Sequence, residues 1–252
     1  MTPEQLSKLQ EHDSSMLSAL KEGNYSAALM HSQESLHFFV SQIMHLTNIY
    51  DFTYNDNFLT NHEYVCYLQQ PSVRKAIHAG DVTFNKGYVS YNHLNEVIMT
   101  SKKPWLSEAL ERGLEVLIYN GNLDVIVNVP GIYFLITVSR VKFSKRHFLG
   151  TNRVVNSLQW SGKKEFLNSE RKDFWVYNER SGQGELAGYV NEGGGLTYAI
   201  IRNAGHMVPI SQPLWALDLV TQFTHLSATP ASNRFEKPSE IKPGPGVKFF
   251  DC

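Results

Sequence analysis

The residues Leu114–Tyr119 form a short apolar run, LEVLIY, that follows Gly113 and ends at the turn-forming pair Asn120-Gly121. Runs of this kind are typical of strands that lie inside a parallel sheet with both faces covered. Parallel strands need long crossover connections, which are usually helices. This segment therefore predicts a strand of a parallel sheet. The order of elements that follows it, which is strand, acidic loop, helix, strand, His loop and helix, predicts an α/β protein.

Predicted helices and strands follow one another along the rest of the chain. A capping box at Thr2-Pro3-Glu4-Gln5 opens the first helix, and Gly23 ends it. Two strands, Glu185–Val190 and Leu196–Arg202, form a hairpin with a glycine-rich turn. Apolar periodicity and start signals predict the remaining helices at Tyr25–Leu46, Pro71–His78, Leu106–Gly113, Lys163–Val176 and Pro213–Leu226.

Two side chains of catalytic type follow predicted strands. Asp124 lies in the turn after Leu114–Tyr119, and His206 lies in the loop after Leu196–Arg202. Functional side chains in α/β sheets gather at the carboxyl ends of the strands. A histidine held by a buried carboxylate takes the proton of a hydroxyl nucleophile, and the order Asp before His is that of α/β-hydrolases. Spacing alone does not separate a catalytic pair from two structural residues.

The composition excludes some classes of function. The net charge of the 252 residues is −1, so nothing predicts binding to nucleic acid or to a membrane surface. The longest apolar stretch, Ile132–Val138, is too short to span a bilayer. The polar start of the chain has no secretory signal, which leaves a cytosolic protein or a chain whose true N-terminus is missing.

The sequence predicts no metal site and no cofactor. Cys66 and Cys252 lie far apart and define neither a disulfide framework nor a metal site. His31, His37 and His45 share a predicted helix without zinc spacing, so we interpret them as surface or packed histidines. The three glycines at 193–195 belong to a hairpin turn and not to a phosphate-binding loop.

The sequences around Asp124 and His206 resemble motifs of one enzyme family. Val116–Val127 reads VLIYNGNLDVIV, and Arg202–Pro213 reads RNAGHMVPISQP. These segments resemble the Asp and His motifs of the serine carboxypeptidases, with the greatest likeness to vitellogenic-like carboxypeptidases. Further similar segments are VRKAIHAG at 73–80, TFNKG at 83–87, SKKPWLSEAL at 101–110 and ELAGYV at 185–190. The resemblance covers most of residues 1–226.

The resemblance implies an α/β-hydrolase fold, of which this chain would hold the C-terminal part of the doubly wound sheet and part of a helical cap. Residues 1–60 would be the cap segment and 61–227 the C-terminal lobe, with a predicted insertion at 132–150. The composition of residues 228–252, which are rich in Pro, Ser, Lys and Gly, predicts a flexible tail. Asp124 is then the orienting carboxylate, and His206 is the general base and later the general acid. Met207 would line the pocket for the residue before the scissile bond, although a core methionine that fills a gap is the alternative interpretation.

The resemblance also implies a reaction and a setting. The family releases single residues from peptide C-termini through an acyl-enzyme, without a metal or cofactor, and is usually secreted or lysosomal. The expected partners are therefore peptide or protein C-termini, and not nucleic acid or membranes. On the secretory route, Asn24-Tyr25-Ser26 becomes a candidate N-glycosylation site. Some relatives are acyltransferases or lyases, and this sequence does not separate those chemistries from peptide hydrolysis.

The family's nucleophilic serine is missing from this sequence. The family carries it in a Gly-Glu-Ser-Tyr-Ala-Gly elbow, but no Gly-x-Ser-x-Gly occurs here, and Ser161 and Ser181 lack a glycine two residues before them. We favour a fragment or truncated isoform that is inactive unless the missing N-terminal half is supplied. A non-catalytic binding or regulatory isoform is the alternative. Without neighbouring strands Leu114–Tyr119 would expose an apolar edge, so we expect the isolated chain to be poorly soluble or partly unfolded.

Residues 132–150 interrupt the similarity to the family sequences, which resumes after this segment. The segment IYFLITVSRVKFSKRHFLG is basic, contains no acidic residue and begins with a run of high β-propensity. It is either a functional basic hairpin or binding loop, or an intron or splice variant carried into the translation, and we favour the second hypothesis. Because the segment closely follows Asp124, it leaves open whether this carboxylate reaches His206.

Overall fold

The computed structural model describes the chain except for residues 55–62, 85–86, 127–148, 179–181, 225–234 and 236–252. The described residues form two compact units that are separated in the sequence between Ser101 and Lys102. The segments predicted from the sequence, 1–60, 61–227 and 228–252, divide the chain differently and stay predictions. No helix in the described part of the chain is both long and apolar enough to cross a membrane.

The N-terminal unit is helical. In α1 (Pro3–Lys21) the predicted capping box is confirmed, because the Thr2 hydroxyl accepts a hydrogen bond from the Gln5 N–H at 3.2 Å and the Gln5 side chain accepts one from the Thr2 N–H at 2.8 Å. Gly23 follows the helix with a φ of 73°, in the left-handed region that glycine adopts at helix ends. The other helices of this unit are α2 (Tyr25–Phe38), the π-helical turn η1 (Phe39–Ile43), α3 (Glu63–Gln69), α4 (Pro71–Ala76) and α5 (Tyr88–Ile98).

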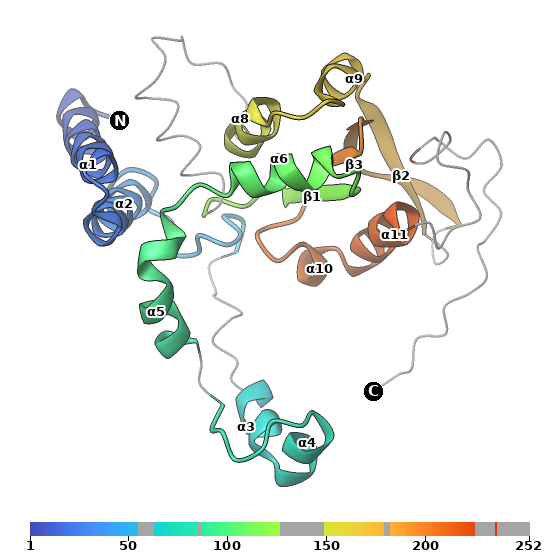
Figure 1. Cartoon of the computed structure of the whole chain (residues 1–252), viewed down its shortest axis with the longest axis horizontal. Coiled ribbons are helices and arrows are strands. Elements are labelled where there is room, and N and C mark those ends of the chain that lie inside the picture. Colours follow the sequence, from blue (N-terminus) through green and yellow to red (C-terminus); the bar gives the residue numbers. More distant parts are fainter. Residues whose placement is uncertain (55–62, 85–86, 127–148, 179–181, 225–234, 236–252) are drawn as a thin grey trace. The chain divides into compact units, whose positions relative to one another are not determined.

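Helices α1 and α2 pack against each other as a helical hairpin (Figure 1). Leu9 of α1 and Ala28 of α2 are almost completely buried. Asp13 is buried too, and its Oδ1 accepts a hydrogen bond of 3.2 Å from the Ser35 hydroxyl. Burial raises the pKa of Asp13 to about 6, although the hydrogen bond from Ser35 acts in the opposite direction. Apolar contacts and one buried polar pair therefore join the two helices.

The C-terminal unit is built on a four-stranded sheet with the order β1-β4-β3-β2. β1 runs parallel to β4, whereas β3 runs antiparallel to both β4 and β2. The parallel pair confirms the strand direction predicted from LEVLIY, and the mixed sheet with its helices confirms the α/β class. The predicted position inside a parallel sheet is not confirmed, because β1 is the end strand of the described sheet, begins only at Val116 and is half-buried over Val116–Ile118. The strands are β1 (Val116–Gly121), β2 (Lys172–Asn178), β3 (Gln183–Gly193) and β4 (Leu196–Ile201).

Helices cover both faces of this sheet (Figure 1). β4 contributes to two apolar cores, because successive side chains of a strand point to opposite faces. Leu196 and Tyr198 belong to the core beneath α6, α8 and α9. Ala199 and Ile201 belong to the core beneath α10 and α11. These helices are α6 (Lys103–Glu111), α8 (Leu149–Ser157), α9 (Lys163–Asn168), α10 (Val208–Ser211) and α11 (Pro213–Phe223).

One predicted helix is wrong in its second half. The sequence pattern predicts a single helix over Lys163–Val176, but α9 ends at Asn168 and β2 begins at Lys172. Phe174 and Val176 are buried on the same face of β2, and aromatic and β-branched side chains fit such a surface well. The other predicted helices and the β3–β4 hairpin are confirmed, although their ends are shifted. The helix predicted at Tyr25–Leu46 corresponds to α2 followed by η1. Helices α3, α5, α8 and α10 have no counterpart among the predictions.

Two predicted segments lie almost entirely outside the described residues. The insertion at 132–150 is described only at its last two positions, which begin α8. The tail at 228–252 is described only at Phe235, whose ring contacts the ring of Phe174 edge-on at 5.7 Å between centroids. The interpretations of both segments therefore stay predictions.

The turn between β3 and β4 makes a close backbone contact with the chain before α9. Gly194 and Gly195 have φ angles of 55° and 84°. A Cβ atom on Gly194 would lie 2.2 Å from the carbonyl oxygen of Gly162. The indole N–H of Trp160 also donates a hydrogen bond of 2.7 Å to the Gly194 carbonyl oxygen. Gly194 is therefore required both for its backbone conformation and for the space that it leaves.

We predict that Gly194→Ala destabilises the C-terminal unit more than Gly182→Ala does. Both glycines are left-handed, which costs an alanine about 1 to 2 kcal/mol, but only Gly194 faces a neighbouring backbone, since nothing lies within 4 Å of a Cβ on Gly182. The clash should add about 1 to 3 kcal/mol to the loss of unfolding free energy. Urea unfolding followed by tryptophan fluorescence reports on this unit, because all four tryptophans lie from Trp105 onward. Equal losses in the two variants would contradict the prediction.

Candidate active site

The parallel pairing of β1 with β4 brings the carboxyl ends of two strands together. Gly121, the last residue of β1, is in register with Ile201, the last residue of β4. Asp124 follows β1 by three residues, and His206 follows β4 by five. Both predicted catalytic residues therefore emerge at the same edge of the sheet, where α/β proteins place their functional side chains.

Backbone contacts fix the loop that carries Asp124. The Asn122 N–H donates to the Ile201 carbonyl oxygen at 3.0 Å, and the Leu123 N–H donates to the Ala204 carbonyl oxygen at 2.9 Å. Gly121 lies against the same loop, and a Cβ atom there would be 2.1 Å from the Ala204 carbonyl oxygen. Glycine is thus needed at this position because the two loops approach so closely, and not because of its backbone angles.

The loop that carries His206 is held from its other side by α10. Asn203 has a φ of 49°, a left-handed conformation that asparagine tolerates better than most residues. Its carbonyl oxygen accepts a hydrogen bond of 3.0 Å from the Gln212 side chain. The Gly205 N–H donates to the Ser211 hydroxyl at 3.2 Å. Hydrogen bonds to Asn203 and Gly205 therefore fix the loop just before the His206 imidazole.

The two predicted catalytic side chains contact each other directly. Nδ1 of His206 lies 3.0 Å from Oδ2 of Asp124. The Asp124 side chain is 1% exposed, whereas the His206 side chain is 33% exposed. A buried carboxylate beside one ring nitrogen favours the tautomer in which Nδ1 carries the proton and donates it to the carboxylate. In that tautomer Nε2 is the basic nitrogen, so the arrangement has the geometry of a base and its orienting acid.

The other predicted site residues are placed as follows. Met207 directly follows His206, is half-buried and precedes α10, whose first turn donates N–H groups to the Met207 carbonyl oxygen. Asn24 is exposed in the N-terminal unit, where its Oδ1 caps α2 by accepting the Ala27 N–H at 3.1 Å. Of the two serines that precede a glycine, Ser161 donates its N–H to the Glu111 carboxylate and Ser181 lies outside the described residues.

The supporting roles of two residues inside the quoted motifs were not predicted. Gly121 leaves room for the Ala204 carbonyl oxygen, about 80 positions later, and the Ser211 hydroxyl accepts a hydrogen bond from the Gly205 N–H, six positions earlier; no local pattern signals either role. An apolar cavity of about 320 Å³ is lined by residues of β1, α10 and α11, and not by Asp124, His206 or Met207. Tyr119, Pro209 and Leu217 line it. Pro209 comes three residues after His206, so the cavity begins close to the imidazole loop.

Comparison with known proteins identifies relatives of this chain. The serine carboxypeptidase family matches residues 3–226. The human protein named probable serine carboxypeptidase CPVL is 35% identical over 64% of this chain. The venom serine carboxypeptidase of Apis mellifera is 38% identical over 63%, and the vitellogenic carboxypeptidase of Aedes aegypti is 34% identical over 63%. The matched part of this chain spans 29% of the length of each of these relatives.

A solved structure resembles the chain as well. It is that of KEX1(delta)p, a prohormone-processing carboxypeptidase from Saccharomyces cerevisiae, with 19% sequence identity and a TM-score of 0.47 over 71% of this chain and 36% of that one. The family match, which extends over nearly all of the described residues, is the finding that decides the assignment. This chain belongs to the serine carboxypeptidase family, with its α/β-hydrolase fold.

Proposed function

We propose that the chain contributes the acid–base pair of a serine carboxypeptidase site that releases C-terminal residues from peptides. Asp124 would orient the imidazole, and His206 would act as general base and then as general acid. The observation that carries this proposal is the 3.0 Å contact between His206 Nδ1 and Asp124 Oδ2, made between a buried carboxylate and a partly exposed ring. Family membership supports the same assignment.

In the proposed reaction, Nε2 of His206 takes the proton of a serine hydroxyl as the hydroxyl oxygen attacks the carbonyl of the last peptide bond. The imidazolium that forms is stabilised by the Asp124 carboxylate. It then returns the proton to the departing amine, which leaves as the free C-terminal residue. Water, activated by the same imidazole, hydrolyses the acyl-enzyme and releases the shortened peptide.

The serine itself has no candidate in a nucleophile elbow, because Gly-x-Ser-x-Gly does not occur in the 252 residues. We therefore propose that these residues alone do not turn over peptides and that the serine is supplied by sequence outside them. A chain that binds a partner without catalysis is the second hypothesis, and a stable fold with a saturable partner and no turnover would favour it.

The remaining assignments follow from this proposed function. Met207 would border the pocket for the residue before the scissile bond, because it lies next to His206 and is half-buried. The substrates would be the C-termini of peptides or proteins. The setting would be secreted or lysosomal, and glycosylation of Asn24 is compatible with its exposure, since Oδ1 makes the helix cap and the glycan would attach through Nδ2.

We predict that Asp124→Asn changes the tautomer of His206. The carboxylate only accepts hydrogen bonds and so keeps the proton on Nδ1, whereas the amide of asparagine can donate to Nδ1 and leave the proton on Nε2. ¹⁵N chemical shifts of the imidazole, assigned by their loss in His206→Ala, report which nitrogen is protonated. The matched control is Asp218→Asn, at a half-buried carboxylate of the same unit that accepts a hydrogen bond from the Gln222 side chain. An unchanged His206 tautomer in Asp124→Asn would contradict the proposed role.

We also predict that the purified 252-residue chain neither hydrolyses a blocked dipeptide nor reacts covalently with a fluorophosphonate probe of active serines. The physical reason is that an oriented imidazole without an elbow serine has no hydroxyl to activate. An intact serine carboxypeptidase assayed in parallel shows that the substrate and probe are competent. Turnover that disappears in His206→Ala would show instead that a serine within this chain completes the site.

A further inference from the structure

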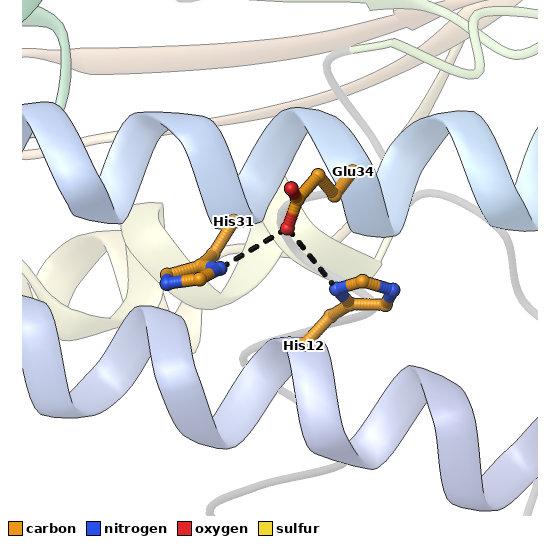
Figure 2. Close-up of side chains that lie close together, drawn as sticks. All are labelled: His12, His31 and Glu34. Atoms are coloured by element: carbon orange, nitrogen blue, oxygen red, sulfur yellow. Dashed lines mark hydrogen bonds and ion pairs between the residues drawn. The ribbon is translucent and has the colours of Figure 1, made fainter.

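Three side chains of types that can bind metal ions lie close together on the helical hairpin of the N-terminal unit, outside the site described above. His12 comes from α1, and His31 and Glu34 come from α2 (Figure 2). His31 and Glu34 are three residues apart, which places them on one face of α2. Figure 2 shows His12 reaching toward that face from the neighbouring helix, so that both imidazoles point at the same carboxylate.

The spacing of the three ligand atoms suits a tetrahedral metal ion. Oε2 of Glu34 lies 3.4 Å from Nδ1 of His12 and 3.1 Å from Nδ1 of His31, and ligand atoms of all three residues lie within 4.8 Å of one another. Zinc binds histidine nitrogen and carboxylate oxygen at about 2.0 to 2.2 Å in a tetrahedron, so its ligand atoms lie about 3.3 Å apart. Both distances from Glu34 Oε2 to the imidazole nitrogens are close to this value.

The chemistry of the three ligands also favours zinc over hard cations. Imidazole suits zinc and its neighbours among the transition metals, whereas calcium and magnesium prefer sites made entirely of oxygen. The side chains of His12, His31 and Glu34 are 20%, 26% and 46% exposed, so an ion can enter from solvent and a water molecule can complete the coordination. Three protein ligands with one open position form a common type of zinc site.

The scaffold beneath the three side chains is fixed by a buried contact. Asp13 and Ser35 directly follow His12 and Glu34 in the sequence, and the Ser35 hydroxyl donates to Asp13 Oδ1 at 3.2 Å. This hydrogen bond holds the two helices in register at the level of the cluster. Metal binding therefore would not have to order the two helices. The free energy needed to order the ligands of a metal site lowers its affinity, and this scaffold reduces that cost.

We propose that His12, His31 and Glu34 bind a zinc ion that ties α1 to α2. The sequence did not predict this site, because His12 lies 19 residues before His31 and shares no local spacing motif with it. The competing explanation is a pair of hydrogen bonds in which both imidazoles donate from Nδ1 to Glu34 without any metal. The two explanations differ in whether the chain binds zinc at this place, which a titration decides.

The test is a zinc titration of the full 252-residue chain near neutral pH, in competition with a chromophoric zinc chelator. Cys66 is exposed and could bind zinc by itself, so both cysteines are replaced by serine in every protein compared. We expect one zinc ion per chain, with an affinity that falls at least about tenfold in His12→Gln and in Glu34→Gln. His37→Gln, at an exposed histidine on the same helix, is the matched control and should bind zinc like the parent.

X-ray absorption of the zinc-loaded parent protein provides a readout that does not depend on any variant folding. Two imidazole ligands and oxygen neighbours are expected in the first shell, and circular dichroism verifies that the variants keep their helices. No competitive zinc binding by the parent, an affinity equal to the parent's in both ligand variants, or a first shell with fewer than two imidazoles would each overturn the proposal. None of these outcomes affects the assignment of Asp124 and His206, which lie in the other unit.

Discussion

The parallel pairing of β1 with β4 is the contact on which the candidate active site depends. Asp124 and His206 are 82 residues apart in the sequence, and only this pairing places the ends of their strands side by side. The same pair organises the packing, because β4 presents alternate side chains to the cores on both faces of the sheet. The backbone hydrogen bonds of Asn122 and Leu123 then continue the contact between the two strands up to Asp124 and His206.

Much of this arrangement could be predicted where the physical cause is local. The capping box at Thr2 and Gln5, the glycine turn between β3 and β4, and the continuous apolar run of β1 each follow from interactions among a few consecutive residues. Asp124 and His206 could be predicted because functional side chains follow strand ends in α/β sheets. The motifs around them predicted the family.

The remaining features depend on contacts that no local pattern contains. The sequence pattern of residues 172–176 looks like a continuation of α9. These residues form a strand because they pair with β3, and Phe174 and Val176 are buried there. Gly121 is required because the loop after β4 passes within contact distance of it. The proposed zinc ligands could not be predicted for the same reason, because His12 lies near His31 and Glu34 only when α1 packs against α2.

The separation of β1 from β4 has a consequence for the order in which the unit assembles. β3 and β4 are joined by a two-residue turn, whereas β1 pairs with a strand 80 positions later, and the entropy lost on closing a loop rises with its length. Domains that are rich in contacts of low sequence separation fold fastest. We therefore expect the β3–β4 hairpin to form before β1 docks, and the contact between Asp124 and His206 to form late. A variant that loosens only the docking of β1 would keep most of its sheet and lose the contact between Asp124 and His206. The protonation state of the two His206 ring nitrogens is therefore a more sensitive measure of complete folding here than secondary structure is.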